Sequence, residues 1–319
     1  MTAIIELRDL TKRYGDLKAV DSLDLAIDQG AVFGFIGPNG AGKTTTMRIL
    51  TTLLRPTSGE ARIAGYSVAD DPRDVRRVIG YMPDYFGVYE DMKVWEYLDF
   101  FAACYDVPAP TRPGMIDDLL ALVDLGHKRD EYVESLSRGM KQRLCLARTL
   151  THDPQVLILD EPASGLDPRA RIEMRELLRE LQKMGKTIFF SSHILAEVAD
   201  ICTSIGIIEN GRLVATGNVD EMMARLRGHR LIAMRFVSGA AVDANEAANW
   251  LRGRPGVLSA TVESGNPSSG MRLDFNGDDQ ALSDLLAGAI AHGLPVIGFN
   301  EERGDLEDVF LQVTQAAAQ

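Results

Sequence analysis

A glycine-rich segment that ends in lysine and threonine predicts a phosphate-binding loop near the N-terminus. Gly37 and Gly42 are five residues apart, and Lys43 and Thr44 follow directly. Glycines let successive backbone N–H groups point at phosphate oxygens, a lysine reaches the terminal phosphates, and a threonine hydroxyl can bind Mg²⁺. The apolar run 32–36 precedes the loop and suits a buried strand. The segment therefore predicts chemistry on the phosphates of a nucleotide.

Three polar residues follow two other apolar runs and are candidates for the hydrolytic part of such a site. Asp160 and Glu161 follow the run 156–159, and His193 comes shortly after the run 187–190. Acidic residues at the end of a parallel strand lie where ligands bind in open α/β sheets. A lone histidine after a strand is usually structural, but this strand is expected in register with the one before Asp160. The other four histidines are interpreted as surface residues.

The elements that must position these residues alternate between strands and helices, which predicts an α/β fold. Strands are expected at 4–10, 18–27, 32–36, 78–82, 156–159, 187–190, 204–209 and 211–217, with a further short strand that ends near residue 64. Helices are expected at about 42–54, 95–101, 115–125, 137–150, 167–184 and 194–202. The first two strands are expected to pair as an antiparallel edge. Asn210 and Gly211 predict a tight hairpin turn.

Composition and charge limit the classes of protein. The chain has 319 residues, 45% of them apolar and 25% charged, which is enough for two domains with full cores. The uncharged stretch 285–300 is too short to span a bilayer and contains Pro295, and the N-terminus has no secretory pattern. Three widely spaced cysteines suit a reducing cytosol. A net charge of −12 disfavours broad attraction to nucleic acid.

An unusual share of the aromatic residues falls in one short region. Nine of the 21 are Tyr81, Tyr85, Phe86, Tyr89, Trp95, Tyr97, Phe100, Phe101 and Tyr105. Some must belong to a core, because residues 95–101 have the pattern of an amphipathic helix. Aromatics are also enriched where proteins dock. The sequence leaves both interpretations open.

Together with three further motifs, this set resembles the nucleotide-binding subunit of ABC transporters over roughly residues 3–217. In that resemblance the phosphate loop is Gly37, Pro38, Asn39, Gly40, Ala41, Gly42, Lys43, Thr44 and Thr45. Tyr14 is similar to the aromatic that stacks on adenine, although by itself it suits a packing residue. The segment 136–143 resembles the family signature, and 164–167 resembles the loop after the second acidic motif. The implied fold is a P-loop NTPase with a mixed sheet and a helical subdomain, and the implied ligands are ATP and Mg²⁺.

The resemblance also implies a role for each polar residue. Asp160, with Thr44, holds Mg²⁺, and Glu161 polarises the attacking water. His193 contacts the γ phosphate. Ser137 and Gly139 bind the γ phosphate of the ATP held by a second copy, so that two copies close around two ATP molecules. Apart from the resemblance, Ser137 would be interpreted as a helix N-cap.

Two positions depart from the family pattern. Asp84 stands where the family usually has glutamine, and its carboxylate could contact Mg²⁺ or the attacking water. We expect ATP hydrolysis to persist. Arg138 and Met140 replace the commonest glycine and glutamine of the signature, and Arg138 either points toward phosphate or faces solvent. Because Glu161 and His193 are present, two equivalent competent sites are expected in a homodimer.

The last hundred residues predict a second domain, so the expected division is 1–217 and 218–319. After a linking helix at 219–226, the expected order is strand 230–236, helix 243–253, strand 257–263, strand 270–275, helix 278–292 and strand 295–300, the βαββαβ order of ferredoxin-like domains. A final helix begins near Asp305. This tail resembles the C-terminal extension of ATPase subunits that serve ABC-2-type exporters, including drug-resistance pumps. Stabilising a dimer and regulating transport remain alternative roles for it.

The leading hypothesis is a cytoplasmic ATPase subunit, peripheral on the inner face of the membrane, that powers a separately encoded permease. The expected partners are that permease and a second copy of the chain, and no nucleic acid. The alternative is a soluble ABC ATPase that acts in translation or nucleic-acid maintenance. Translation factors of this type usually carry two cassettes. Repair and chromosome ATPases insert long coiled coils between phosphate loop and signature, whereas about 94 residues separate Lys43 from Ser137 here.

Overall fold

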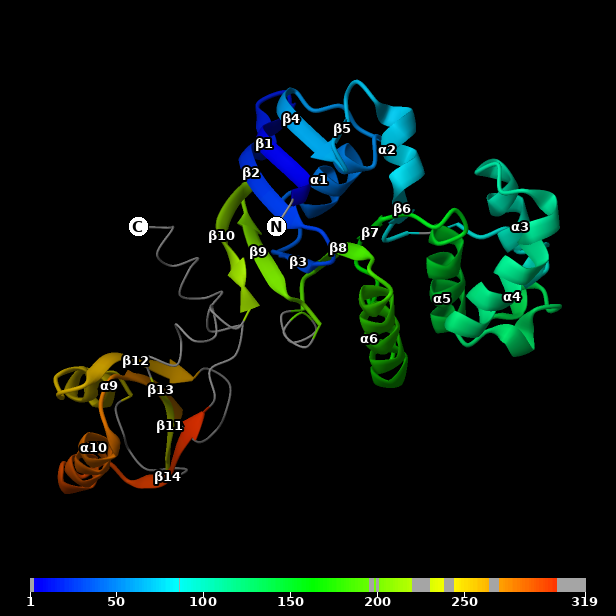
Figure 1. Ribbon diagram of the computed structural model, residues 1–319. Helices are drawn as coiled ribbons and strands as arrows, with labels where there is room; N and C mark the ends of the chain where they lie inside the picture. The colour runs from blue at the N-terminus through cyan, green and yellow to red at the C-terminus, as the bar shows by residue number, and fades with distance from the viewer. Residues whose placement is uncertain are drawn as a thin grey trace. The chain divides into compact units, whose positions relative to one another are not determined.

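The computed structural model describes residues 3–85, 87–194, 198, 201–219, 230–237, 244–263 and 270–302. The chain forms two compact units, Met1–Val219 and Asp220–Gln319, each with its own sheets and helices (Figure 1). Two expected helices, 219–226 and the one beginning near Asp305, lie outside the described residues, as do Phe86 and most of the helix expected at 194–202.

A six-stranded sheet forms the centre of the first unit, in the order β10-β9-β3-β8-β7-β6. Its strands are β3 (Val32–Ile36), β6 (Ile79–Met82), β7 (Val156–Leu159), β8 (Thr187–Ser192), β9 (Ser204–Glu209) and β10 (Arg212–Asn218). All pairs are parallel except the β9–β10 hairpin, whose turn is Asn210–Gly211 as expected. Every residue of β3, β7 and β8 is buried, because a parallel sheet is covered on both faces.

A second, antiparallel sheet contains the two N-terminal strands. Its order is β2-β1-β4-β5, with β1 (Ala3–Tyr14), β2 (Leu17–Asp28), β4 (Ser58–Ile63) and β5 (Tyr66–Ser67). The strands β1 and β2 are longer than expected because their pairing continues to the hairpin tip through several register shifts. Helix α1 (Lys43–Leu50) shares one apolar core with both sheets. It is shorter than predicted, and Thr52 beyond its end has a left-handed φ of 63°.

Helices α3 (Val94–Cys104), α4 (Arg112–Leu122) and α5 (Arg138–Thr149) pack together as a helical subdomain beside the six-stranded sheet (Figure 1). The short α2 (Pro72–Val78) leads into β6, and α6 (Pro168–Lys183) follows β7. Helix α4 begins three residues earlier than expected, since a proline lies in its first turn. Asp124, with φ 54°, follows its last turn.

The aromatic region divides between core and surface. Tyr97 is fully buried on α3, whereas Tyr85, Tyr89, Phe100 and Tyr105 are exposed. Tyr89, Phe100 and Phe101 nevertheless pack on one another, and Tyr89 and Phe101 also pack on Tyr97. The region therefore contributes to the core of the helical subdomain and also presents aromatic side chains to solvent.

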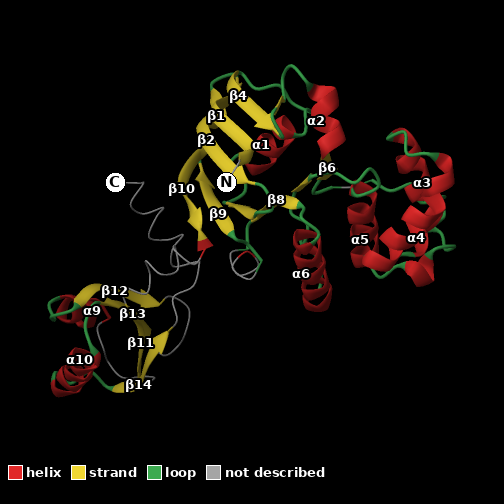
Figure 2. Ribbon diagram, in the orientation of Figure 1, coloured by secondary structure: helices red, strands yellow, loops and turns green. Residues whose placement is uncertain are grey.

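The second unit has the predicted βαββαβ order. Its elements are β11 (Arg230–Phe236), α9 (Ala244–Arg252), β12 (Val257–Glu263), β13 (Gly270–Phe275), α10 (Asp279–Ala291) and β14 (Val296–Glu302). The four strands form an antiparallel sheet in the order β12-β13-β11-β14, and α9 and α10 pack against it (Figure 2). Alternate strand residues such as Ile232, Met234 and Phe236 form its core.

Candidate nucleotide-binding and hydrolysis site

The phosphate loop between β3 and α1 lines an open cavity of about 300 Å³. Seven of the nine predicted loop residues line it: Pro38, Asn39, Gly40, Gly42, Lys43, Thr44 and Thr45. Gly37 and Ala41 are buried in the loop instead. Gly42 precedes α1 with φ 110°, a conformation that side chains disfavour. The cavity therefore lies at the N-terminus of a helix, where backbone N–H groups and the helix dipole favour an anion.

Segments distant in sequence support this loop. The backbone N–H of Gly211, in the β9–β10 turn, donates to the carbonyl oxygen of Ala41 at 2.9 Å. The carbonyl of Gly211 in turn accepts from the N–H of Asp21 in β2. Ala19, also in β2, lines the cavity, and its backbone oxygen lies where a Cβ on Gly42 would be. Sequence reasoning missed Ala19, because an alanine in a strand carries no chemical signal.

Lys43 is only 6% exposed, and its ammonium group faces the loop. Its Nζ donates to the carbonyl oxygens of Gly37 at 2.5 Å and Pro38 at 3.2 Å, and lies 3.7 Å from Oε1 of Glu161. Burial lowers the pKa of Lys43, and the carboxylates of Glu161 and Asp160 act in the opposite direction. The lysine is therefore held beside both predicted acidic residues.

Asp160 and Glu161 come together with His193 because β7 and β8 are neighbours in register. His193 is 45% exposed, and its Nδ1 lies 2.8 Å from Oε2 of Glu161. A carboxylate can only accept, so Nδ1 carries the proton and donates. Glu161 has a left-handed φ of 52°, which is unusual for a residue with a side chain. In this structure the histidine thus orients the carboxylate predicted to act on water.

Asp160 is 1% exposed and does not line the cavity. Its Oδ1 accepts a hydrogen bond from the Ser191 hydroxyl at 2.7 Å. Its Oδ2 is buried and has no hydrogen-bond partner among the described residues. Buried carboxylate oxygens are normally paired, so this oxygen suits a cation or a cation-bound water.

The donors present fit Mg²⁺ bound together with a nucleotide. Among the residues that the structure describes, no group of three or more His, Cys, Asp or Glu side chains could hold a metal alone. Mg²⁺ sites typically combine one or two protein ligands with substrate phosphates. Thr44, at the first turn of α1, and Asp160, with its unpartnered oxygen, supply that kind of donor set.

Two other predicted site residues differ in their placement. Asp84 lines the same cavity as Lys43 and Glu161, so the structure brings this unusual carboxylate to the phosphate loop. Tyr14 is not among the residues that line the cavity. Its ring is 50% exposed at the end of β1, and Nζ of Lys12 lies 5.3 Å from the ring centroid.

Ser137 and Gly139 line a separate cavity of about 230 Å³ at the start of α5. The Ser137 hydroxyl accepts from the Met140 N–H at 3.3 Å, which is the N-cap bond expected from sequence. The Arg138 guanidinium covers Gly165 and donates to the carbonyl of Ser164 at 3.5 Å. Arg138 is exposed, as one of the two sequence alternatives expected, and its side chain also contacts the 164–167 loop.

Comparison with known proteins agrees with these features. Residues 20–164 match the family described as "ABC transporter", and residues 217–314 match "ATP-binding protein DrrA1-3-like, C-terminal domain". The Nod factor export ATP-binding protein I of Ralstonia nicotianae is 35% identical over 98% of this chain and 94% of its own length. The chain belongs to the ABC transporter ATP-binding proteins. Members of this family are ATPases coupled to transport, so the chain is an ABC-type ATPase.

Two further ABC ATP-binding proteins are also similar to this chain. The bacitracin transport ATP-binding protein BcrA of Bacillus licheniformis is 42% identical over 71% of this chain and 74% of its own length. The daunorubicin resistance ATP-binding protein DrrA3 of Streptomyces coeruleorubidus is 34% identical over 95% of this chain and 93% of its own. The chain therefore resembles the ATP-binding subunits of ABC-2-type exporters.

Solved ABC structures share the fold of the first unit. A structure described as "ATP binding subunit of ABC transporter" superposes with a TM-score of 0.64 and 31% identity, covering 70% of this chain and 93% of its own. The cbiO1 subunit of Clostridium perfringens gives a TM-score of 0.64 at 28% identity, covering 71% and 94%. The described part of the ABC chain contains no helix long and apolar enough to cross a membrane.

Proposed function

We propose that two copies of this chain close around two ATP molecules and drive a separately encoded membrane permease that exports its substrate. The observation that carries this proposal is the division of the predicted ATP contacts between two cavities. One contains the phosphate loop, Glu161 and His193, and the other contains Ser137 and Gly139. Among the residues that the structure describes, none lines both cavities. A nucleotide in the first cavity therefore needs a second copy to reach the signature residues.

The geometry supports a specific division of labour within one site. Lys43 withdraws from the Gly37 and Pro38 carbonyls and binds the terminal phosphates, because phosphate oxygens are stronger acceptors than neutral carbonyls. Glu161 then loses its lysine neighbour and accepts a proton from the attacking water. His193 holds the Glu161 carboxylate in place through Nδ1.

Mg²⁺, when bound at Thr44 and Asp160, offsets the negative charge that develops on the transferring phosphate. Asp84 lines the same cavity and is a further candidate for contact with the metal or the water. The remaining predicted contacts are proposals of the same kind. Tyr14 stacks on the adenine ring, and Ser137 and Gly139 of the other copy complete the site at the N-terminus of α5.

The permease is proposed to place the chain at the inner face of the cell membrane. The names of the relatives, which refer to export, transport and drug resistance, support an exporter. The exposed aromatics of the helical subdomain, Tyr85, Tyr89 and Phe100, supply a surface of the composition that docking sites favour. The net charge of −12 argues against nucleic acid as the partner.

The central test compares Glu161→Gln with Glu161→Gln plus Ser137→Ala, using light scattering with and without ATP. The single variant binds ATP without hydrolysing it and is expected to dimerise. The double variant is expected to bind ATP with similar affinity and remain monomeric, because Ser137 contacts only the nucleotide of the other copy. Ser135→Ala in the same background is the matched control, since Ser135 bonds to Glu131 and Tyr132 and lines neither cavity.

A strictly monomeric ATP-bound Glu161→Gln protein, alone and with the permease, would refute the proposal. For the partner, membranes are extracted with this variant and ATP, and the retained integral membrane protein is identified. Deleting its gene must abolish the association. Association with ribosomes or nucleic acid instead would favour the soluble alternative.

A further inference from the structure

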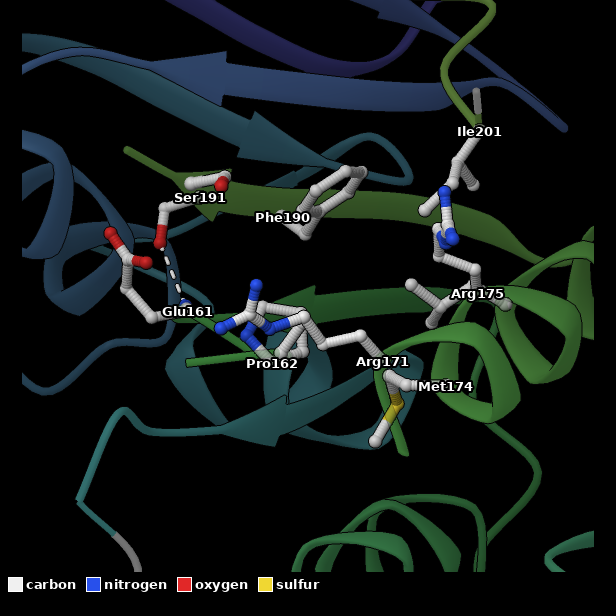
Figure 3. A pocket seen from close by; sticks show the side chains of 11 residues that line it. Glu161, Pro162, Arg171, Met174, Arg175, Phe190, Ser191 and Ile201 are labelled. Carbon is white, nitrogen blue, oxygen red and sulfur yellow. Dashed lines mark hydrogen bonds between the residues drawn. The ribbon is translucent and has the colours of Figure 1, made fainter. Parts of the chain in front are cut away.

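A serine outside the predicted site residues links the two acidic residues of the site. Ser191 lies in β8, two residues before His193, and is 0% exposed. Its hydroxyl donates to Oδ1 of Asp160 at 2.7 Å. The same oxygen accepts the backbone N–H of Glu161 at 2.9 Å, the bond drawn in Figure 3. One buried hydroxyl therefore contacts both neighbouring residues at the end of β7.

The direction of both bonds is fixed by chemistry. A backbone N–H can only donate, and a carboxylate can only accept. The single hydroxyl proton of Ser191 is therefore donated to Asp160, while one of the oxygen lone pairs accepts the N–H of Glu161. Alanine would leave a buried N–H and a buried carboxylate oxygen unpaired at once.

This arrangement determines which Asp160 oxygen remains free. Oδ1 is occupied by Ser191, whereas Oδ2 is buried without a hydrogen-bond partner among the described residues. Rotation of the carboxyl group would break the 2.7 Å bond. The serine thus fixes the plane of the Asp160 carboxylate, with one oxygen bonded to Ser191 and the other left unpaired.

The second bond acts on the backbone of Glu161. Its φ of 52° lies in the left-handed region. This conformation costs a non-glycine residue free energy, so it persists only where the surrounding structure holds it. The N–H of Glu161 is held by Ser191, and its carboxylate is held by His193. A small pocket of about 10 Å³ lies on the α6 side of these residues and is lined by Glu161, Phe190 and Ser191 (Figure 3). Glu161 also lines the open phosphate-loop cavity, so these two hydrogen bonds, rather than close packing, hold the residue.

We propose that Ser191 is a positioning residue of the ATPase site, which sets the Asp160 carboxylate for Mg²⁺ and holds the backbone of Glu161. It acts through Asp160 and Glu161 and does not itself contact substrate. The inference rests on the proposed binding of Mg²⁺ and ATP by this chain. Partners that orient a metal-binding carboxylate typically change metal affinity by about 10- to 100-fold when they are removed.

The experiment measures binding without turnover. The full chain and its Ser191→Ala variant are titrated with Mg²⁺ at saturating AMP-PNP, a non-hydrolysable analogue, and thermal unfolding is recorded at each point. Separate titrations with AMP-PNP and EDTA measure nucleotide binding without the metal. Ser191→Ala is expected to bind AMP-PNP in EDTA as the unmodified chain does, and to need about 10-fold more Mg²⁺ for half of the metal-dependent shift.

A matched control removes another buried hydroxyl from the same strand. Thr187 lies four residues earlier in β8, is fully buried, and accepts the N–H of Gly30 at 2.9 Å, away from the acidic pair. Thr187→Val is expected to lower the unfolding temperature without changing the Mg²⁺ requirement. A general packing role for buried hydroxyls would give both variants the same behaviour.

A second pair keeps the test decisive if Ser191→Ala does not fold. Ser191→Thr and Ser191→Val have the same shape and differ only in the hydroxyl. The threonine variant is expected to require less Mg²⁺ than the valine variant. Equal Mg²⁺ requirements for the folded Ala variant and the unmodified chain, or for Thr and Val, would overturn the positioning role. Failure of the unmodified chain to bind AMP-PNP would instead overturn the proposed function.

Discussion

Replacing either of two glycines in the phosphate loop with alanine should have very different effects on stability. Gly40 and Gly42 both have positive φ, 83° and 110°. A Cβ on Gly40 meets no atom within 4 Å. A Cβ on Gly42 would overlap the backbone oxygen of Ala19, well inside 3.0 Å, and would lie 3.3 Å from a methyl group of Ile208. The two substitutions therefore share a conformational cost and differ in a steric one.

The magnitudes follow from these two terms. A left-handed conformation costs an alanine about 1–2 kcal/mol, and the loss of glycine freedom in the unfolded chain returns about 0.4–1 kcal/mol. Gly40→Ala should thus destabilise by about 0–1.6 kcal/mol. Overpacking adds about 1–3 kcal/mol. The obstructing atom is a backbone oxygen of Ala19, which lies between the paired residues Lys18 and Val20 of β2 and cannot rotate away as a side chain could. Gly42→Ala should therefore cost about 1–4.6 kcal/mol.

Urea unfolding of the full chain measures both free-energy changes, and titration with ATP measures the affinity of the phosphate loop for nucleotide. Gly42→Ala is also expected to weaken ATP binding, because relief of the overlap moves the start of α1 away from β2. If Gly42→Ala unfolds within about 0.5 kcal/mol of Gly40→Ala and binds ATP equally well, the argument that β2 supports the loop is wrong.

Three further changes test other parts of the structure. Asp84→Gln should raise the Mg²⁺ concentration for half-maximal ATPase rate by about 10-fold, since it removes a carboxylate from the cavity. The Arg148 guanidinium donates to the Tyr97 hydroxyl at 3.3 Å and lies 5.0 Å from the Phe101 ring centroid. Measured by urea unfolding, Arg148→Met should lower the free energy of unfolding by about 1 kcal/mol and Arg148→Ala by about 2–3 kcal/mol. Burial lowers the pKa of His152 below its ordinary value of about 6.5, so the unfolded state binds a proton more readily than the folded state. Stability should therefore fall as the pH drops below about 6.5. His152→Gln should flatten this pH dependence when unfolding is measured from about pH 7.5 to 5.

Each of these expectations has a contrary result. Unchanged basal and permease-stimulated rates for Asp84→Gln would make its catalytic or coupling role untenable. Equal stabilities of Arg148→Met and Arg148→Ala would show that the aliphatic part of Arg148 contributes no packing. A His152→Gln chain with the unmodified pH dependence would place the responsible proton on another group.

The sequence predicted most of the order of elements, because most strands and helices of the first unit carry their own local pattern; the short β5 and α2 were not predicted. The buried strands β3, β7 and β8 are continuous apolar runs, and α5 and α6 begin at the N-caps Ser137 and Asp167. Element ends were predicted less well. Strands β1 and β2 extend to the hairpin tip through bulges, which depend on cross-strand pairing and leave no local signal.

The features of the site likewise separate into those that the sequence could predict and those that it could not. The residue types and spacing of the phosphate loop, Asp160, Glu161 and His193 indicated nucleotide chemistry, because glycines, lysine and carboxylates carry that chemistry themselves. Arg138 was an open question in the sequence, and its contact with Gly165 follows from the approach of α5 to a loop that is distant along the chain.

The sequence by itself determined which reaction this chain can support, since the functional groups and their local turns are written in consecutive residues. Tertiary structure alone decided how those groups are held. Ala19 and Gly211 support the loop, and Ser191 joins Asp160 to Glu161, through contacts between strands that are far apart in sequence. A buried serine or alanine has no distinguishing pattern along the chain, and its role depends on what the sheet places beside it.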